Sequence, residues 1–171
     1  YGLRMLSARL PEVIVATSFS KNFGLYRERT AALSFVFADE QQADAGLSNL
    51  LSVARSIYSM PPAHGAALVD IILHSTELTK VWSDELTLMR ERIAGLRVNL
   101  VQTLNQLQTQ RDFSFIANER GMFSFLGLSV EQVHRLKNDY SIYMTDTSRI
   151  SVAGLTVEKM DYVSKAIASV L

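Results

Sequence analysis

The longest periodic segment of the chain covers residues 76–108 and predicts a single helix. Its apolar residues recur at three- and four-residue spacings and form one stripe: Leu78, Val81, Trp82, Leu86, Met89, Ile93, Leu96, Leu100, Leu104 and Leu107. A helix of about 31 residues extends on the order of 45 Å, which exceeds the diameter of a small domain. We therefore expect it to leave one domain and to form the spine of another, which divides the chain into domains 1–75 and 76–171.

The part of the chain before this helix predicts an α/β arrangement. Its expected elements are a helix tail over 1–12, strands over 13–17 and 30–38, a helix from Asp39 to about Ser59, and a helix that starts at Pro61 and Pro62. The segment 13–17 is β-branched and almost wholly apolar, as is typical of a buried strand in a parallel sheet. Asp39 can cap the helix that follows it, and proline is tolerated in a first helical turn.

The part of the chain after the long helix changes to short elements. We expect strands over 112–116, 122–126, 142–145 and 149–152, a helix over 129–140 and a last helix over 157–171. Ser129 followed by Gln132 has the spacing of a helix cap. Strands and helices mixed in this way predict a small α+β domain packed on the long helix.

Charge and cysteine content narrow the classes of partner. With 17 basic and 17 acidic side chains the net charge is zero, so no overall field attracts the chain to nucleic acid or to an anionic membrane. The absence of cysteine removes disulfides and thiolate chemistry. No apolar run approaches the roughly 20 residues that span a bilayer, and the chain does not start with a signal-peptide pattern. We therefore expect a soluble, cytoplasmic protein whose partners are small molecules or protein surfaces.

The first residue and the histidines of the chain bear on processing and on metal binding. The chain begins with Tyr1 rather than methionine, so we expect a processed chain or a piece of a longer one. Its three histidines, His64, His74 and His134, lack the ligand spacing of a metal site. We expect His64 to cap or pack and the other two to lie on helix surfaces, with no metal bound.

One lysine follows the first predicted strand closely. Open α/β sheets bind ligands beyond the carboxyl ends of their strands, and Lys21 comes shortly after the strand over 13–17. A lysine reacts with an aldehyde only as the neutral amine, which an apolar surrounding favours. Phe19, Phe23 and Leu25 can provide that surrounding. The alternative is an ordinary exposed lysine in a loop between two strands.

The residues around Lys21 suit a phosphate group. Ser18 and Ser20 offer hydroxyl donors, and Arg29 offers a planar fork of donors that matches two phosphate oxygens. An aldehyde that also carries a phosphate suggests pyridoxal phosphate.

Four segments of the chain resemble one enzyme family, in the same order. The stretch 18–29, SFSKNFGLYRER, is similar to the cofactor-lysine segment of the aspartate and aromatic aminotransferases, the fold-type I pyridoxal phosphate enzymes. Residues 54–65, 120–125 and 148–155 resemble further segments of that family. The resemblance implies an α/β fold, namely the carboxyl-terminal part of a PLP-dependent transferase fold: the end of the large cofactor-binding domain over 1–75 and the small α+β domain over 76–171.

The resemblance also implies roles at the cofactor. Lys21 becomes the catalytic residue and the covalent anchor of pyridoxal 5'-phosphate, Ser18 and Arg29 hold the phosphate, and Ser20 assists. The enzyme would carry out transamination between an amino acid, aspartate or an aromatic one, and a 2-oxo acid such as 2-oxoglutarate. Aspartate is slightly favoured, because SKNFGLY is more similar to that branch.

Three residues are expected at the substrate. By resemblance, Arg149 binds the α-carboxylate, and Arg55 reaches into the neighbouring subunit of a homodimer to pair with a side-chain carboxylate, so that the active sites are shared. Phe123 borders the substrate pocket. Without the resemblance, these residues would be interpreted as a surface arginine in an ion pair, a helix-end partner of the dipole and a core aromatic.

The resemblance covers only about the carboxyl-terminal half of the family's length. The missing amino-terminal half would supply further cofactor contacts, so we expect the chain alone to be inactive. An alternative is a non-catalytic fragment of the same fold that serves as a structural or interaction module. Ser148 stands where the family usually has glycine, and Met60 where it usually has asparagine.

Overall fold

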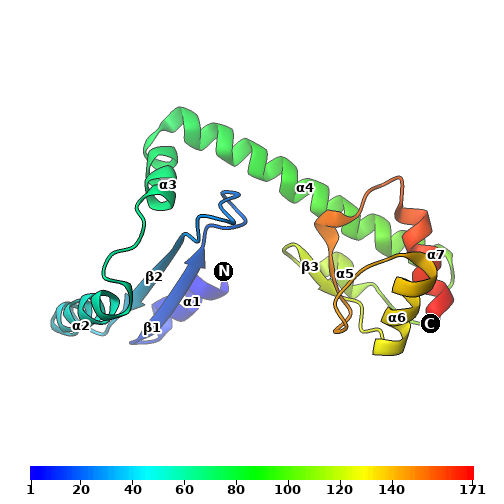
Figure 1. Ribbon diagram of the computed structural model, residues 1–171, viewed down its shortest axis with the longest axis horizontal. Coiled ribbons are helices and arrows are strands. Elements are labelled where there is room, and N and C mark those ends of the chain that lie inside the picture. Colours follow the sequence, from blue (N-terminus) through cyan, green and yellow to red (C-terminus); the bar gives the residue numbers. More distant parts are fainter. The chain divides into compact units, whose positions relative to one another are not determined.

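The computed structural model describes residues 1–171, and the chain divides into two compact units, Tyr1–Ser83 and Asp84–Leu171 (Figure 1). The junction between the units falls within the long helix α4 (Thr76–Gln106). This helix is the one that the apolar stripe predicts. The domain ranges 1–75 and 76–171 stay a prediction.

The first unit places a pair of strands among helices. Its elements before α4 are α1 (Gly2–Arg9), β1 (Val13–Ser18), β2 (Ala31–Val36), α2 (Glu40–Tyr58) and α3 (His64–His74). β1 and β2 run antiparallel, with Val13 opposite Val36 and Ser18 opposite Ala31.

The expectation of a buried parallel strand over 13–17 is wrong for this chain. β1 pairs only with β2, in a two-stranded antiparallel sheet. Ile14 on β1 and Leu33 on β2 keep 68% and 61% of their surface exposed. An apolar β-branched run indicates a strand that can be buried, but it does not indicate whether the neighbouring strand runs parallel or antiparallel to it.

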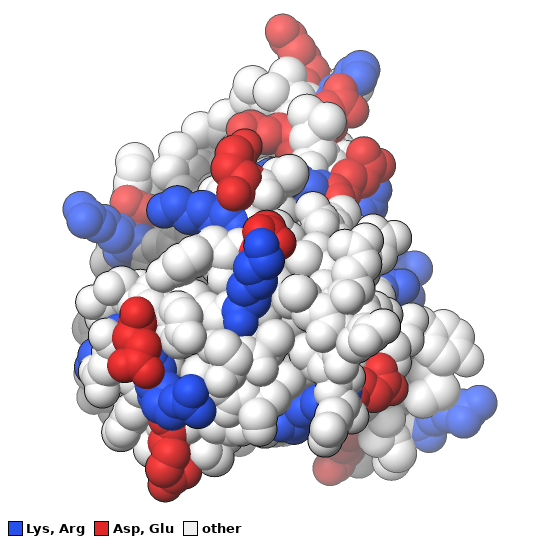
Figure 2. Space-filling view, turned by 90° about the vertical axis from the view of Figure 1, so that its right-hand side faces the viewer, with Lys and Arg blue, Asp and Glu red and all other residues white.

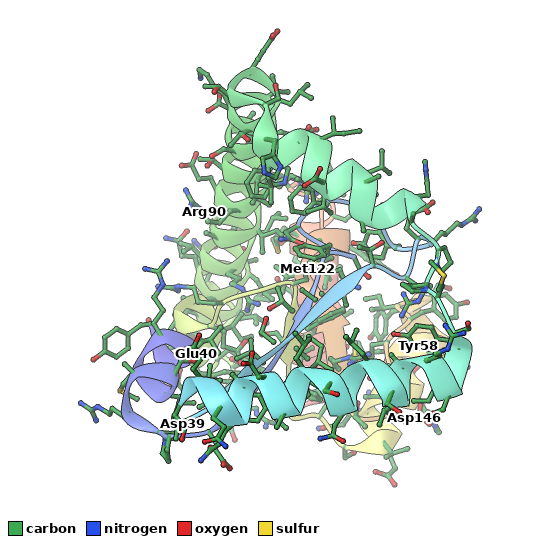
Figure 3. All side chains as sticks on the ribbon, turned by 90° about the vertical axis from the view of Figure 1, so that its left-hand side faces the viewer. Asp39, Glu40, Tyr58, Arg90, Met122 and Asp146 are labelled. Atoms are coloured by element: carbon green, nitrogen blue, oxygen red, sulfur yellow. The ribbon has the colours of Figure 1, made fainter.

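Helix α2 begins directly after Asp39, the cap that the sequence predicts. The Asp39 carboxylate accepts a hydrogen bond from the Gln42 amide at 2.8 Å, and the helix ends at Tyr58, at the far end from Asp39 and Glu40 (Figure 3). Gly46 lies against the ring of Phe37, which a Cβ at this position would overlap. Pro61 and Pro62 separate α2 from α3 but do not start α3, which begins at His64.

The second unit is built on the later turns of α4. It contains α5 (Phe115–Asn118), β3 (Phe123–Phe125), α6 (Val130–Tyr140), β4 (Arg149–Ser151), the 3-10 helix η1 (Val152–Gly154) and α7 (Met160–Val170). Its core is apolar and includes Leu100, Leu104, Phe113, Ile116, Leu126, Leu136, Val152 and Ile167. β3 and β4 are antiparallel, with Phe125 opposite Arg149, and α6 and α7 lie side by side (Figure 1).

The start of α6 agrees with the helix cap predicted at Ser129. Ser129 caps the helix by accepting from the Gln132 amide at 3.2 Å, while the Gln132 side chain accepts from the Ser129 amide at 2.9 Å. This reciprocal pair is the capping box that the sequence predicts.

Two of the four strands expected here are wrong. In 112–116, the Asp112 carboxylate accepts from the Ser114 amide at 2.7 Å, which forms a turn that leads into α5. In 142–145, Thr145 accepts from the Ser148 amide at 2.8 Å and from the Arg149 amide at 3.2 Å. Side-chain and turn hydrogen bonds therefore replace a strand ladder in both segments. The last helix begins at Met160, later than the expected residue 157.

The surface of the chain mixes both signs of charge. On the face shown in Figure 2, basic and acidic side chains are interspersed among uncharged ones, as the equal totals of 17 and 17 lead one to expect. None of the helices is both long enough and apolar enough to cross a membrane.

Candidate active site

A loop over residues 19–30, here called the lysine loop, joins β1 to β2. Its neck is closed by the Phe19 amide, which donates to the Thr30 carbonyl at 3.1 Å. Lys21 lies in a turn, where its carbonyl accepts from the Gly24 amide at 3.2 Å. Gly24 has a φ of +67°, a conformation that glycine adopts without steric cost.

The side chain of Lys21 is exposed to solvent. Its Nζ lies 4.4 Å from the centre of the Tyr26 ring, in a cation–π arrangement. The dry surrounding expected from Phe19, Phe23 and Leu25 is wrong, because the lysine is exposed. Phe19 and Phe23 meet edge to face, with 5.5 Å between their ring centres. Tyr26 is a neighbour of Lys21 that the sequence argument did not identify.

Trp82 anchors the lysine loop to the start of α4. Its indole Nε1 donates to the Asn22 carbonyl at 2.7 Å, and its ring stacks on Phe23 with 4.6 Å between centres. The side-chain oxygen of Asn22 is buried without a hydrogen-bond partner. From the sequence, Trp82 was predicted only as part of the apolar stripe of α4. The sequence did offer one indication of its role. Trp82 is the single tryptophan of the chain, and an indole N–H that packs against the protein needs a hydrogen-bond acceptor.

The two residues expected at the phosphate lie at the two ends of the lysine loop. Ser18, the last residue of β1, accepts from the amide of the buried Ser20 at 3.2 Å. Arg29 is exposed, has a φ of +52°, and donates from Nη1 to the Tyr26 carbonyl at 3.0 Å. The remaining donors of its guanidinium have no partner within the protein. These donors are therefore open to a ligand.

The donor set of the lysine loop fits a phosphorylated aldehyde. It offers a primary amine at Lys21, a hydroxyl at Ser18 and open guanidinium donors at Arg29, which are the groups that bind an aldehyde and a phosphate. α3 packs closely on the neck, since a Cβ at Gly65 would overlap the Thr30 hydroxyl.

Arg55 lies in the last turn of α2 and is exposed. No hydrogen bond or ion pair joins its guanidinium to the lysine loop or to any other part of the chain. The structure therefore leaves this cation free on the surface of the first unit.

In the second unit, Arg149 and Phe123 lie together. They stand on the paired strands β4 and β3, and the guanidinium carbon of Arg149 lies 4.8 Å from the centre of the Phe123 ring. Both side chains are exposed. The cation lies over the face of the ring, a contact that uses none of its N–H donors, so these donors stay available to a carboxylate.

Ser148 shapes the backbone just before Arg149. It is fully buried and has a φ of +65°. Its hydroxyl accepts from the Leu128 amide at 2.9 Å, and its carbonyl accepts from the Leu126 amide at 3.0 Å. The serine thus takes the left-handed conformation that favours glycine and adds a buried hydrogen bond.

A buried arginine supports the other strand of this pair. Arg97 on α4 is 2% exposed and donates to groups of the segment 116–124, among them the Phe123 carbonyl at 2.7 Å. Arg97 is not among the residues predicted from the sequence. The sequence pattern that could have indicated it is its position: Arg97 is a charged residue one position after Leu96 and four after Ile93, next to the apolar stripe of α4.

No metal centre accompanies these residues. The structure holds no group of three or more His, Cys, Asp or Glu residues that could bind a metal ion. His74 contacts Asp70 at 3.0 Å and His134 contacts Asp146 at 3.5 Å, both on the surface. The surface hollows beside α1 and beside residues 107–111 include none of the candidate residues.

Comparison with known proteins extends these observations. The sequence profile of the aminotransferase class I and II family matches residues 1–167. The aspartate aminotransferase of Haemophilus influenzae is 46% identical over 171 residues, which are 100% of this chain and 43% of that protein. The aromatic-amino-acid aminotransferase of Pseudomonas aeruginosa is 41% identical and is matched over 99% of this chain and 43% of its own length. The chain thus spans about 43% of the length of these relatives.

A solved structure shows the same fold. The aromatic-amino-acid aminotransferase from Burkholderia pseudomallei, covalently bound to pyridoxal phosphate, superposes with a TM-score of 0.93 at 46% identity. The match covers 99% of this chain and 42% of that protein. The predicted fold, the carboxyl-terminal part of a PLP-dependent transferase, is therefore confirmed.

Proposed function

This chain belongs to the family of class I and II aminotransferases, and we propose that it forms the carboxyl-terminal part of a longer enzyme that transfers an amino group between an amino acid and a 2-oxo acid. The observation that carries the proposal is the lysine loop. It presents the exposed Lys21 amine together with the Ser18 hydroxyl and the open donors of Arg29. Residues 1–75 then belong to the large cofactor domain and 76–171 form the small domain.

The cofactor of this enzyme is pyridoxal 5'-phosphate, as in the Burkholderia pseudomallei relative. Ser18 and Arg29 hold its phosphate, and Ser20 supports Ser18 through its amide. When bound, the cofactor acts as a sink for the electrons left when the amino-acid Cα loses its proton. Lys21 Nζ would hold the cofactor covalently and, once displaced by the amino group of the substrate, would take that proton as a general base and deliver it as a general acid to the cofactor carbon.

The substrate is held by its carboxylates. Arg149 donates in the plane of its guanidinium to the α-carboxylate, with Phe123 against its face. Arg55 pairs with the side-chain carboxylate of a dicarboxylic substrate bound to the partner subunit, because its guanidinium has no contact within this chain. The enzyme is then a cytoplasmic homodimer with shared active sites. Aspartate and 2-oxoglutarate are the preferred pair, with aromatic amino acids as the second candidates.

The test of the cofactor anchor is covalent trapping in the full-length protein. Reduction with borohydride after incubation with pyridoxal 5'-phosphate should place the label on Lys21, and Lys21→Ala should abolish both label and transamination. Lys137→Ala removes an exposed lysine of α6 and should change neither. Label at other lysines only would refute the assignment.

The test of substrate preference compares aspartate with phenylalanine as amino donor. Arg55→Ala should lower kcat/KM for aspartate and leave that for phenylalanine nearly unchanged, since only aspartate carries a side-chain carboxylate. Unchanged turnover of aspartate would show that Arg55 does not bind that group. The chain by itself should show no activity, because it lacks the amino-terminal half.

A further inference from the structure

We propose that Arg97 is a positioning residue for the substrate arginine: it fixes β3, and so holds the Phe123 ring against Arg149. The inference depends on the proposed function, in which Arg149 binds the substrate carboxylate. It concerns a side chain that touches neither cofactor nor substrate.

The hydrogen bonds of Arg97 all go to one short segment. Nη1 donates to the Ile116 carbonyl at 3.2 Å, the Glu119 carboxylate at 3.0 Å and the Ser124 hydroxyl at 3.0 Å. Nη2 donates to the carbonyls of Gly121 at 3.0 Å and Phe123 at 2.7 Å. Ser124, buried at 1% exposure, also donates to Glu119. One guanidinium thus binds the end of α5, the turn after it and β3.

Packing does not explain a charge at this position. Moving a guanidinium out of water is costly even when it is paired, and an apolar side chain of similar volume fills such a core position at least as well. What arginine adds is a rigid planar fork that sets several acceptors in one geometry. Arg97 therefore defines the course of the segment 116–124 rather than merely filling space.

The fixed segment leads directly to the substrate arginine. Phe123, whose carbonyl makes the shortest bond of the Arg97 set, places its ring 4.8 Å from the guanidinium carbon of Arg149. β3 is three residues long and pairs only with β4. So short a strand gives Phe123 little support of its own, and Arg97 supplies the support from the side of α4.

The experiment uses Arg97→Lys in the full-length protein, since lysine keeps the charge but cannot bind five acceptors in a fixed plane. We expect KM for both substrates to rise about tenfold, the effect of losing about one charge-assisted hydrogen bond, with kcat nearly unchanged. Succinate, an unreactive dicarboxylate, should bind correspondingly more weakly by calorimetry. Covalent labelling of Lys21 should not change. Arg90→Met is the matched control: Arg90 lies on the same helix (Figure 3), is 71% exposed and contacts only Glu91.

A double-mutant cycle separates positioning from general loss of structure. If Arg97 acts through Arg149, then adding Arg97→Lys to Arg149→Lys should raise KM little further. Fully additive effects, or an unchanged KM and succinate affinity in Arg97→Lys, would overturn the inference. If that variant does not fold, Ser124→Ala decides, because it removes one acceptor of β3: a KM raised about threefold supports positioning, and an unchanged KM overturns it. Failure of the proposed function looks different, because the unsubstituted protein would then neither bind succinate nor carry label on Lys21.

Discussion

The serine before Arg149 allows two opposing effects to be measured separately. Ser148→Ala keeps the left-handed backbone, φ +65°, and removes the hydroxyl that accepts from the Leu128 amide. Ser148→Gly removes the same hydroxyl but relieves the backbone strain. The buried amide left without an acceptor costs about 1–3 kcal/mol in both variants. Relief of the left-handed conformation returns about 1 kcal/mol in the glycine variant only.

We therefore expect both variants to be less stable than the unsubstituted protein, with Ser148→Ala the less stable of the two by about 1 kcal/mol. Urea denaturation midpoints of the full-length protein rank the three. Ser141→Gly is the matched control: Ser141 also has a positive φ of +53° but is exposed at the end of α6, so this variant should gain stability. If Ser148→Ala were as stable as Ser148→Gly, strain at this residue would not be what the φ value implies. If both matched the unsubstituted protein, the buried hydrogen bond would contribute nothing.

Three further predictions follow from single contacts. Trp82→Phe keeps the stack on Phe23 but loses the hydrogen bond to the Asn22 carbonyl at 2.7 Å. Peptide mapping should then show slower labelling of Lys21 by pyridoxal 5'-phosphate. An unchanged rate of labelling would mean that the indole does not hold the loop. Hydrogen bonds from the Ser114 amide and hydroxyl lower the pKa of Asp112, so this carboxylate stabilises the fold at neutral pH and loses that effect on acidification. Asp112→Asn should be less stable than the unsubstituted protein at pH 7, and the difference should shrink as the pH falls from about 4 through the lowered pKa. A constant difference across pH would contradict this origin. Leu104→Ala, at a core position with 0% exposure, should cost about 2–5 kcal/mol in urea denaturation, and a cost below about 1 kcal/mol would show that the core closes around the cavity.

The elements that the sequence predicted correctly are those encoded within a few residues of themselves. The caps at Asp39 and Ser129 depend on a side chain and an amide three residues away, and the stripe of α4 repeats over its whole length. The direction in which β1 pairs depends on β2, a partner that spacing cannot reveal. The absence of strands in 112–116 and 142–145 has a local cause, because the turn hydrogen bonds of Asp112 and Thr145 were not recognised in the apolar pattern.

In the candidate site, too, residues close together in the sequence could be grouped more easily than residues far apart. Lys21 and Arg29 belong to one loop and Ser18 immediately precedes it, so one motif was enough to group them. The contact of Phe123 with Arg149 joins two strands, and only the resemblance assigned both residues to one pocket. Trp82 was assigned only to the apolar stripe of α4, and Arg97 was not predicted at all, because a single charged residue beside the stripe indicates no partner. Their roles depend on hydrogen bonds to carbonyls of residues 22 and 116–123, which no periodicity encodes.

The continuity of α4 has a consequence for how this chain can change length. Trp82 binds the lysine loop and Arg97 binds β3, and both project from one uninterrupted helix. Trp82 and the lysine loop belong to the first unit, whereas Arg97 and β3 belong to the second, so each contact depends on the helix turns within its own unit. Inserting one residue between Arg97 and Leu100 would turn the guanidinium by about 100° about the helix axis relative to the core side chains of Leu100 and Leu104, and so away from β3. Insertions should therefore be tolerated in the turns on either side of α6, but between Arg97 and Leu104 the number of residues should behave as fixed.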